Sequence, residues 1–256
     1  MKKKNLLPKI SVITVVLNND KQIQRCIKSV INQNYPKKKI EYIIIDGGST
    51  DNTVSIIKKF RKKITFWHSK KDKGLFDAMN QGIKKSSGDI IGILNSDDYY
   101  NKNALKIVSK YFLIKKIDYL FGSVKKNRIY HNFFPDRLWY TFNIFPSHSV
   151  SFFITKKAQK KVGFYNTKFK YSSDRDLIYR LIKIKNLKAF ATKKNEVLGI
   201  FNMTGLSSRV SFYKKIIEEI KIRLSNKESF IQTFGIMVIF IIYHFVQKIL
   251  KGILKK

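Results

Sequence analysis

The sequence is poor in the residues that cross-link a chain, stiffen it or allow its sharpest turns. Its 256 residues include one cysteine, four prolines and twelve glycines. The single cysteine, Cys26, excludes an intrachain disulfide framework. Apolar residues surround Cys26 at helical spacing: Ile23, Ile27, Val30 and Ile31. We therefore expect Cys26 to be a small core residue.

Acidic residues are also scarce, with 17 Asp and Glu against 52 Lys and Arg, for a formal net charge of +35. The lysines are spread along the whole chain, which a biased genome would produce without any functional demand. The excess also fits attraction to anionic lipid, to a phosphorylated substrate or to nucleic acid. A basic nucleic-acid-binding protein should lack an ordered set of acids. The acids described below oppose that alternative, and we expect no nucleic-acid partner.

Several targeting and cofactor motifs are missing. Residues 1–8 are basic and contain no apolar run long enough for a signal peptide, so we expect the catalytic part to remain cytoplasmic. No Gly-x-Gly-x-x-Gly follows the first apolar run, and no phosphate-loop Lys-Ser/Thr motif is present. A dinucleotide-binding protein therefore loses its main support. The hydrophobic content of 44% is ordinary for a globular protein.

Short apolar runs alternate with amphipathic stretches. Strands are expected at 10–17, 40–45, 64–68 and 90–94, separated by helices ending near 33, 61 and 85. Farther along we expect helices at about 101–114 and 172–184, and strands at 118–122, 125–130, 150–154, 189–191 and 197–201. This order predicts an α/β fold with a mostly parallel sheet flanked by helices on both faces.

Acids close two of these strands. Asp46 ends the second strand, and Gly47 and Gly48 after it permit a tight turn and close approach of a ligand. Asp97 and Asp98 follow the strand at 90–94, at the sheet edge where ligands of open α/β sheets bind. Two carboxylates there suit a divalent cation carrying a phosphate. They also suit the cap of the next helix, and the residues alone leave both open.

Together, a series of motifs makes the chain resemble the family 2 glycosyltransferases, in particular bacterial members that build surface polysaccharides. The motifs are Ile13-Thr14-Val15-Val16-Leu17-Asn18-Asn19, Ile45-Asp46-Gly47-Gly48-Ser49-Thr50-Asp51, Asp72-Lys73-Gly74-Leu75-Phe76-Asp77-Ala78-Met79-Asn80-Gln81-Gly82, Leu94-Asn95-Ser96-Asp97-Asp98, His148 before Phe152-Phe153, Ser173-Asp174-Arg175-Asp176-Leu177, and Gly205-Leu206-Ser207. The resemblance implies a single GT-A type (Rossmann-like) domain with a mixed sheet. It also implies inverting transfer of a hexosyl or N-acetylhexosaminyl group from a nucleotide sugar, commonly a UDP-sugar, with Mn2+ or Mg2+.

The resemblance assigns a nucleotide-sugar site to Val16, Asn18, Asp46, Asp72, Lys73, Asp77, Asn80 and Asp97. Asp46 would accept hydrogen bonds from the base, although an Asx turn is its alternative. Asp77 and Asn80 either contact the nucleotide or brace the metal loop, and Lys73 is otherwise one of many solvated lysines. The chain departs from many relatives, which carry Asp at the position of Gly47 and Tyr at that of Leu17.

The remaining roles concern metal and catalysis. Asp97 and Asp98 match the metal-loop acids, of which one would bind the cation and the other ribose or a metal-bound water. Asp174 matches the base that takes a proton from the acceptor hydroxyl, and its expected helix amino end keeps it ionised. A plain N-cap is the alternative for Asp174, and a structural histidine is the alternative for His148. The acceptor or diphosphate region would contain His148, Asp176 and Ser207.

The last 48 residues are basic and then apolar. Residues 209–224 form an expected amphipathic helix, and residues 230–246 are nearly all apolar, about 25 Å of helix. Three alternatives remain for this second stretch. It lies in the membrane interface, it spans the bilayer, or it docks on protein, either the catalytic domain or a second subunit. We expect a catalytic domain at 1–208 (nucleotide half 1–100, acceptor half 101–208) and a segment at 209–256 that holds a cytoplasmic enzyme peripherally on the inner face of the membrane.

The expected partners are a nucleotide sugar donor, a lipid-linked or oligosaccharide acceptor and an anionic membrane surface, with a homodimer left open. The expected setting is synthesis of cell-surface polysaccharide such as O-antigen, capsule or lipooligosaccharide. A non-catalytic, glycosyltransferase-like assembly subunit is the alternative. The presence of all the key acids opposes it.

Overall fold

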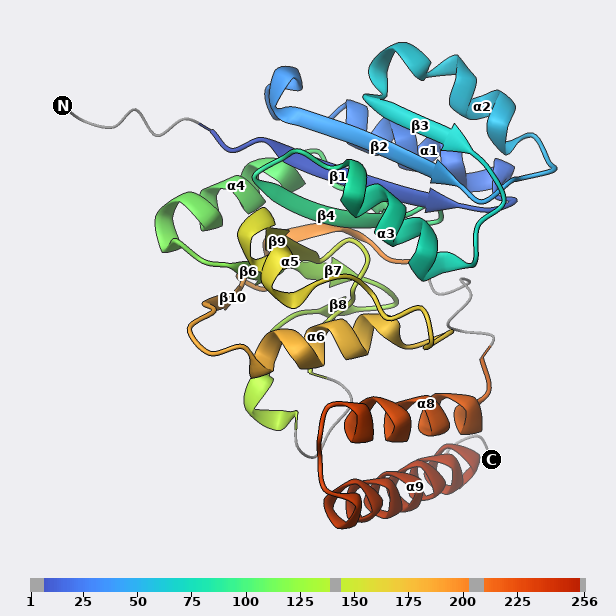
Figure 1. The fold of residues 1–256 in the computed structure, drawn as a ribbon, viewed down its shortest axis with the longest axis vertical. Coiled ribbons are helices and arrows are strands. Elements are labelled where there is room, and N and C mark those ends of the chain that lie inside the picture. Colours follow the sequence, from blue (N-terminus) through green and yellow to red (C-terminus); the bar gives the residue numbers. More distant parts are fainter. Residues whose placement is uncertain (1–6, 139–143, 203–209, 254–256) are drawn as a thin grey trace.

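The structure, a computed structural model, describes residues 7–138, 144–202 and 210–253 (Figure 1). Its amino-terminal part alternates strands and helices in the expected order. The elements are β1 (Ile10–Val16), α1 (Asp20–Ile31), β2 (Ile40–Asp46), α2 (Thr53–Lys59), β3 (Phe66–Ser69), α3 (Leu75–Lys85) and β4 (Ile90–Asn95). All seven residues of β1 are buried, as expected for a strand covered on both faces.

The central sheet has seven strands in the order β10-β6-β9-β4-β1-β2-β3. Its other strands are β6 (Tyr119–Phe121), β9 (Phe152–Thr155) and β10 (Ala189–Ala191). Strand β9 runs antiparallel to β4 and β6, while the remaining pairs are parallel. The predicted α/β fold with a mixed, mostly parallel sheet is confirmed.

Helices cover both faces of this sheet. One core packs α1, α2 and α4 (Ala104–Lys115) on one face, and a second core packs α3, α5 (Lys156–Val162) and α6 (Ser173–Lys183) on the other. Cys26 belongs to the first core and is fully buried, which raises the pKa of its thiol to about 12. The expectation that Cys26 is a core residue is confirmed.

The single strand expected at 125–130 is wrong. The chain instead forms β7 (Ser123–Lys125) and β8 (Ile129–Tyr130), an antiparallel pair closed where the Lys126 N–H donates to the Arg128 carbonyl at 2.9 Å. With β5 (Tyr99–Tyr100) and β11 (Val197–Ile200), these strands make a second sheet in the order β5-β11-β7-β8. Because β5 follows β4 so closely, Asp97 and Asp98 lie in the turn that connects the two sheets.

The carboxyl-terminal segment forms an antiparallel pair of helices, α8 (Phe212–Ser225) and α9 (Phe230–Ile253), with α8 between α9 and α6 (Figure 1). Helix α8 is anchored by polar contacts to the rest of the chain. Arg223 is fully buried and pairs with Glu219 and Glu228, and Glu218 accepts hydrogen bonds from backbone N–H groups of residues 170 and 171. Helix α8 therefore packs on the part of the chain before residue 208, and the division of the chain at that residue stays a prediction.

Among the residues that the structure describes, no helix combines the length and the apolar character needed to cross a membrane.

Candidate active site

The carboxyl ends of β1, β2 and β4 converge, and side chains tie their loops together. The Asn18 side-chain oxygen accepts from the Thr50 N–H at 2.8 Å, while the Asn18 N–H donates to the Ser49 hydroxyl at 2.8 Å. The Asn19 side-chain amide donates to the Ser96 hydroxyl at 2.8 Å, which joins the β1 loop to the acidic turn. Asn19 was not predicted as a site residue, although its signal is the Asn pair that ends β1.

Asp46 organises the β2 loop. It is fully buried, and its carboxylate accepts from the backbone N–H groups of Gly48 (3.1 Å) and Ser49 (2.9 Å) and from the hydroxyls of Ser49 and Ser69. The Asx turn weighed for this residue is therefore formed. Val16 contributes its backbone carbonyl, which accepts from the Gly47 N–H at 2.9 Å. A contact between Asp46 and a nucleobase stays a prediction.

Asp72 reaches over the same loop. A Cβ atom placed on Gly47 would lie 2.6 Å from one Asp72 carboxylate oxygen, while the other oxygen accepts from the Gly74 N–H at 2.8 Å. Burial and the nearby charges of Asp77 and Asp46 raise the pKa of Asp72. Gly47 thus leaves the space that the Asp72 carboxylate occupies beside the β2 loop, near Asp46.

Replacing Gly47 with Ala should weaken nucleotide binding about tenfold, a cost of about 1.4 kcal/mol, because the new methyl group must displace the Asp72 carboxylate. Titration calorimetry with UDP would measure this. Gly235→Ala is the matched control, since a Cβ there meets nothing within 4 Å. Removing Asp72 as well should add little further loss. An unchanged dissociation constant for Gly47→Ala would exclude a role for Asp72 at the nucleotide.

Asp77 and Asn80 brace neighbouring backbone, and a contact of either one with the nucleotide stays a prediction. Asp77 lies in the first turn of α3, where its carboxylate accepts from the Lys73 N–H at 3.1 Å and the Gln81 amide at 2.9 Å. Asn80 is buried and grips the backbone of Tyr165, donating to its carbonyl and accepting from its N–H, both at 2.9 Å. Asn80 therefore braces the loop before α6, and not the metal loop. The Lys73 side chain is exposed at the start of α3.

The acidic turn contains two buried oxygen atoms without a partner among the described residues. One is an Asp98 carboxylate oxygen, the other the side-chain oxygen of Asn95. Asp98 is only 1% exposed, and its second oxygen accepts from the Asn202 N–H at 2.7 Å. Burial and the negative charge of Asp97 raise the pKa of Asp98 to about 8, and burial also raises the pKa of Asp97. The turn therefore requires a proton or a cation to offset its charge.

Two basic residues that were not predicted lie close to these acids. The Lys126 ammonium is half-buried, lies 4.5 Å from the Phe201 ring centre and lowers the pKa of Asp98. The Arg25 guanidinium stacks 4.1 Å from the Tyr99 ring centre and lowers the pKa of Asp97. No local signal distinguishes these two residues among 52 Lys and Arg, because only the fold brings α1 and the β7–β8 turn to the acids.

The described residues include no group of three or more His, Cys, Asp or Glu side chains arranged to hold a metal ion. Asp97, Asp98 and Asn95 nevertheless fit a hard divalent cation, because they supply two carboxylates and an unpartnered amide oxygen. Such ions commonly take one or two carboxylates and complete their coordination with water and phosphate. The donor set therefore suits Mg2+ or Mn2+ bound together with a diphosphate.

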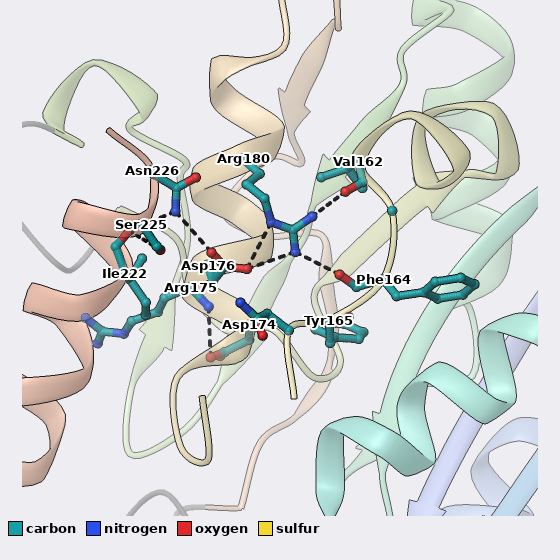
Figure 2. A network of polar contacts seen from close by, with 12 residues as sticks. Val162, Phe164, Tyr165, Asp174, Arg175, Asp176, Arg180, Ile222, Ser225 and Asn226 are labelled. Carbon is teal, nitrogen blue, oxygen red and sulfur yellow. Dashed lines mark hydrogen bonds and ion pairs between the residues drawn. The ribbon is translucent and has the colours of Figure 1, made fainter. Parts of the chain in front are cut away.

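Asp174 lies in the first turn of α6, so the expected helix amino end is confirmed (Figure 2). It is half-buried and accepts from the Arg175 N–H at 2.9 Å. Its negative charge raises the pKa of the buried Tyr165, after the larger effect of burial, and acts on His148 in the same direction. Asp174 is therefore near this aromatic pair and remains open to a ligand on its exposed side.

His148 and Tyr165 form a buried pair, with the imidazole Nε2 and the phenol oxygen 2.5 Å apart. Burial lowers the pKa of His148, which favours a neutral ring. The segment after His148 is fixed to β4, since the Asn95 N–H donates to the Ser149 hydroxyl at 2.9 Å. Val150 adopts a left-handed φ of 72°, a costly conformation for a β-branched residue and a feature common at functional sites. His148 is thus coupled to both Asp174 and the acidic turn.

Asp176 is buried, and both of its carboxylate oxygens have protein partners, while its assignment to the acceptor or diphosphate region stays a prediction. One carboxylate oxygen pairs with Arg180 at 2.9 Å, and the other accepts from the Asn226 amide at 3.0 Å (Figure 2). Arg180 in turn donates to the carbonyls of Val162 and Phe164. Asp176 therefore orients the site indirectly, by holding the loop that carries Tyr165. Ser207 lies outside the described residues.

This arrangement of a GT-A type sheet, an acidic turn after β4 and an Asp at the start of α6 matches a known family. Residues 11–175 match the family model described as Glycosyl transferase family 2, and the chain belongs to that family. An uncharacterized glycosyltransferase of Mycobacterium tuberculosis (strain H37Rv) is 43% identical over 94 residues, which are 37% of this chain and 36% of that protein.

Staphylococcus aureus TarS, a poly(ribitol-phosphate) beta-N-acetylglucosaminyltransferase, is 34% identical over 101 residues, 38% of this chain and 18% of TarS. Its crystal structure with UDP-GlcNAc has a TM-score of 0.70 at 20% identity, covering 93% of this chain and 73% of that one. The mannosyltransferase PcManGT of Pyrobaculum calidifontis, with GDP-Man and Mn2+, has a TM-score of 0.67 at 14% identity, covering 90% and 68%. These structural likenesses show a shared fold.

Proposed function

We propose that the chain is an inverting glycosyltransferase that moves a sugar from a nucleotide diphosphate sugar, with UDP as the expected nucleotide, to a hydroxyl of a lipid-linked or glycan acceptor. The expected setting is cell-surface polysaccharide synthesis. The names and titles of the similar proteins support this class, since TarS is a glycosyltransferase and was crystallised with UDP-GlcNAc. PcManGT, however, holds GDP-Man, so the donor base is tested below.

The observation that carries the proposal is the buried, unpartnered oxygen of Asp98 beside Asp97, at the carboxyl end of β4. A lone helix cap does not require a buried carboxylate whose pKa is raised to about 8. A cation-diphosphate complex would offset both charges. Asp97, Asp98 and Asn95 would hold that cation, which when bound neutralises charge on the leaving diphosphate.

The other residues of the site would supply the base, positive charge near the diphosphate and contacts to the nucleobase. Asp174 takes the proton of the acceptor hydroxyl as that oxygen attacks the anomeric carbon, from the face opposite to the leaving group. Lys126 and Arg25 add positive charge beside the acids, where the diphosphate leaves. Asp46 and Asp72 lie together at the β2 loop, where two carboxylates can accept hydrogen bonds from the base.

A panel of nucleotide sugars tests this function. The full chain is incubated with UDP- and GDP-sugars, Mn2+ and an acceptor lipid extract, and release of nucleotide diphosphate is followed with and without EDTA. We expect release from one donor class and a loss of about a hundredfold or more on chelation, since the cation contributes several kcal/mol. If no donor gives metal-dependent release, the non-catalytic assembly subunit becomes the better description.

A further inference from the structure

Helix α9 presents an apolar surface that no other described residue covers. It contacts α8 through Ile236 and Met237, which are buried with Ile216. Away from this contact its large side chains are exposed, with Ile231 at 85% and Ile239 at 64%. Residues 230–246 contain no Asp, Glu, Lys or Arg. The exposed face is therefore continuous apolar surface, of the kind that marks an interaction site.

Helix α8 also exposes large apolar side chains, and it adds positive charge to the hairpin. Tyr213 (77% exposed), Ile217 (51%) and Leu224 (39%) recur at helical spacing and share one face. Lys214 and Lys221 are exposed, and their spacing of seven residues places them on the same side of the helix. Lys214 directly follows Tyr213, and Lys221 lies four residues after Ile217. The apolar face of the hairpin is therefore bordered by lysines.

Every acid of residues 209–256 is withdrawn from this surface. These acids are Glu218, Glu219 and Glu228. Glu218 accepts two backbone N–H groups, Glu219 pairs with Arg175 and Arg223, and Glu228 pairs with Arg223. Because all three acids are engaged in these contacts, the charge that α8 presents to solvent is basic.

We propose that the exposed faces of α8 and α9 bind the surface of an anionic lipid bilayer, with α9 lying along the interface. Apolar side chains bordered by lysines suit the acyl boundary and the anionic headgroups together. A second copy of the chain is a poorer occupant, because it would bring the lysines of both copies together without facing acids. The chain's net charge of +35 also favours an anionic bilayer and opposes association of two copies.

The contacts of α8 place this membrane surface near the active site. Arg175 in the first turn of α6 pairs with Glu219 at 3.5 Å, and Asn226 at the end of α8 donates to Asp176 at 3.0 Å. Binding of α8 and α9 to a bilayer would thus hold the Asp174 end of α6 close to lipid headgroups. This consequence rests on the proposed function, whereas the membrane contact itself does not.

Co-sedimentation of the full chain with vesicles tests the proposal. We expect binding to vesicles of phosphatidylcholine and phosphatidylglycerol, weaker binding to phosphatidylcholine alone, and a loss with salt. Ile239→Glu should lower vesicle affinity about tenfold or more, because it places a charge in the apolar contact. Ile114→Glu is the matched control, since Ile114 is also a helical isoleucine with 64% exposure, and its vesicle affinity should not change.

A charge variant provides a second measurement. Lys214→Gln with Lys221→Gln should weaken binding to the anionic vesicles, by roughly fivefold for each lysine, and leave binding to neutral vesicles unchanged. Absent sedimentation, or equal losses for Ile239→Glu and Ile114→Glu, would overturn the proposal. So would a lipid-free dimer, seen by light scattering, that Ile239→Glu dissociates. UDP binding measured on the same variants separates these outcomes from failure of the transferase function.

Discussion

Asp174→Asn should abolish sugar transfer and leave nucleotide binding unchanged. The substitution keeps the size of the side chain and its place in the first turn of α6, but the amide cannot accept the proton of the acceptor hydroxyl. Loss of a general base typically costs roughly a hundred- to ten-thousand-fold in rate. Transfer is measured as release of nucleotide diphosphate with acceptor present, and binding is measured by calorimetry with UDP and Mn2+.

Asp176→Asn is the matched control on the same helix. Its carboxylate pairs with Arg180 and Asn226 and contacts no open part of the site, so we expect a lower melting temperature and a smaller loss of rate. Equal rate losses in the two variants, or lost UDP binding in Asp174→Asn, would remove Asp174 from the role of base. The comparison thus separates a group that moves a proton from one that positions its neighbours.

The sequence was sufficient to predict the central sheet, because its strands carry strong local signals. Runs such as β1 and β2 are mostly apolar and are closed by polar residues such as Asn18 and Asp46, so both position and type were readable. The second sheet was missed because β5 and β8 have two residues each and depend on pairing with distant strands. The turn in the predicted strand at 125–130 was likewise invisible without its tertiary context.

The acids of the site were readable for the same reason, since Asp46, Asp97 and Asp174 stand at element ends. Their partners were not. Lys126 reaches Asp98 from a hairpin, and Asn80 holds Tyr165 across 85 residues of sequence. Side chains that act through distant contacts have no local pattern, because many exposed lysines and asparagines have the same neighbours in sequence. Asp77 and Asp176 match the family motif, but the groups that their side chains hold were not readable from the sequence.

The contacts around Asp176 also connect the carboxyl-terminal helices to the candidate active site. Asp176, Arg180 and Asn226 connect α8 to the loop at 162–165, and Asn80 fixes the same loop from α3. That loop carries Tyr165, the partner of His148. The position of the buried pair beside Asp174 therefore depends on elements from both ends of the chain.

The second large effect concerns Asp98 and pH. In the metal-free chain, the contribution of Asp98 to the unfolding free energy, measured as the difference between wild type and Asp98→Asn, should fall as pH rises from about 4 to about 8, because folded Asp98 retains a proton that the unfolded chain has lost. The sign follows from the raised pKa: the stabilisation is complete below the ordinary value of 3.8 and is lost as pH passes the folded value of about 8. The slope reaches at most about 1.4 kcal/mol per pH unit.

Asp98→Asn should remove this slope, remove stabilisation by Mn2+ at pH 8, and reduce metal-dependent transfer about a hundredfold or more. The amide stays neutral at every pH and is a poorer ligand for a hard cation than a carboxylate. Asp136→Asn, which removes an acid at an exposed position, should retain the slope and the response to Mn2+. Denaturant unfolding between pH 4 and 8, with Mn2+ or with EDTA, measures all three quantities. Equal pH slopes in wild type and Asp98→Asn would mean that Asp98 is ionised in the metal-free fold, and that the Ser149 side chain, the Asn202 N–H and Lys126 offset the cost of its burial.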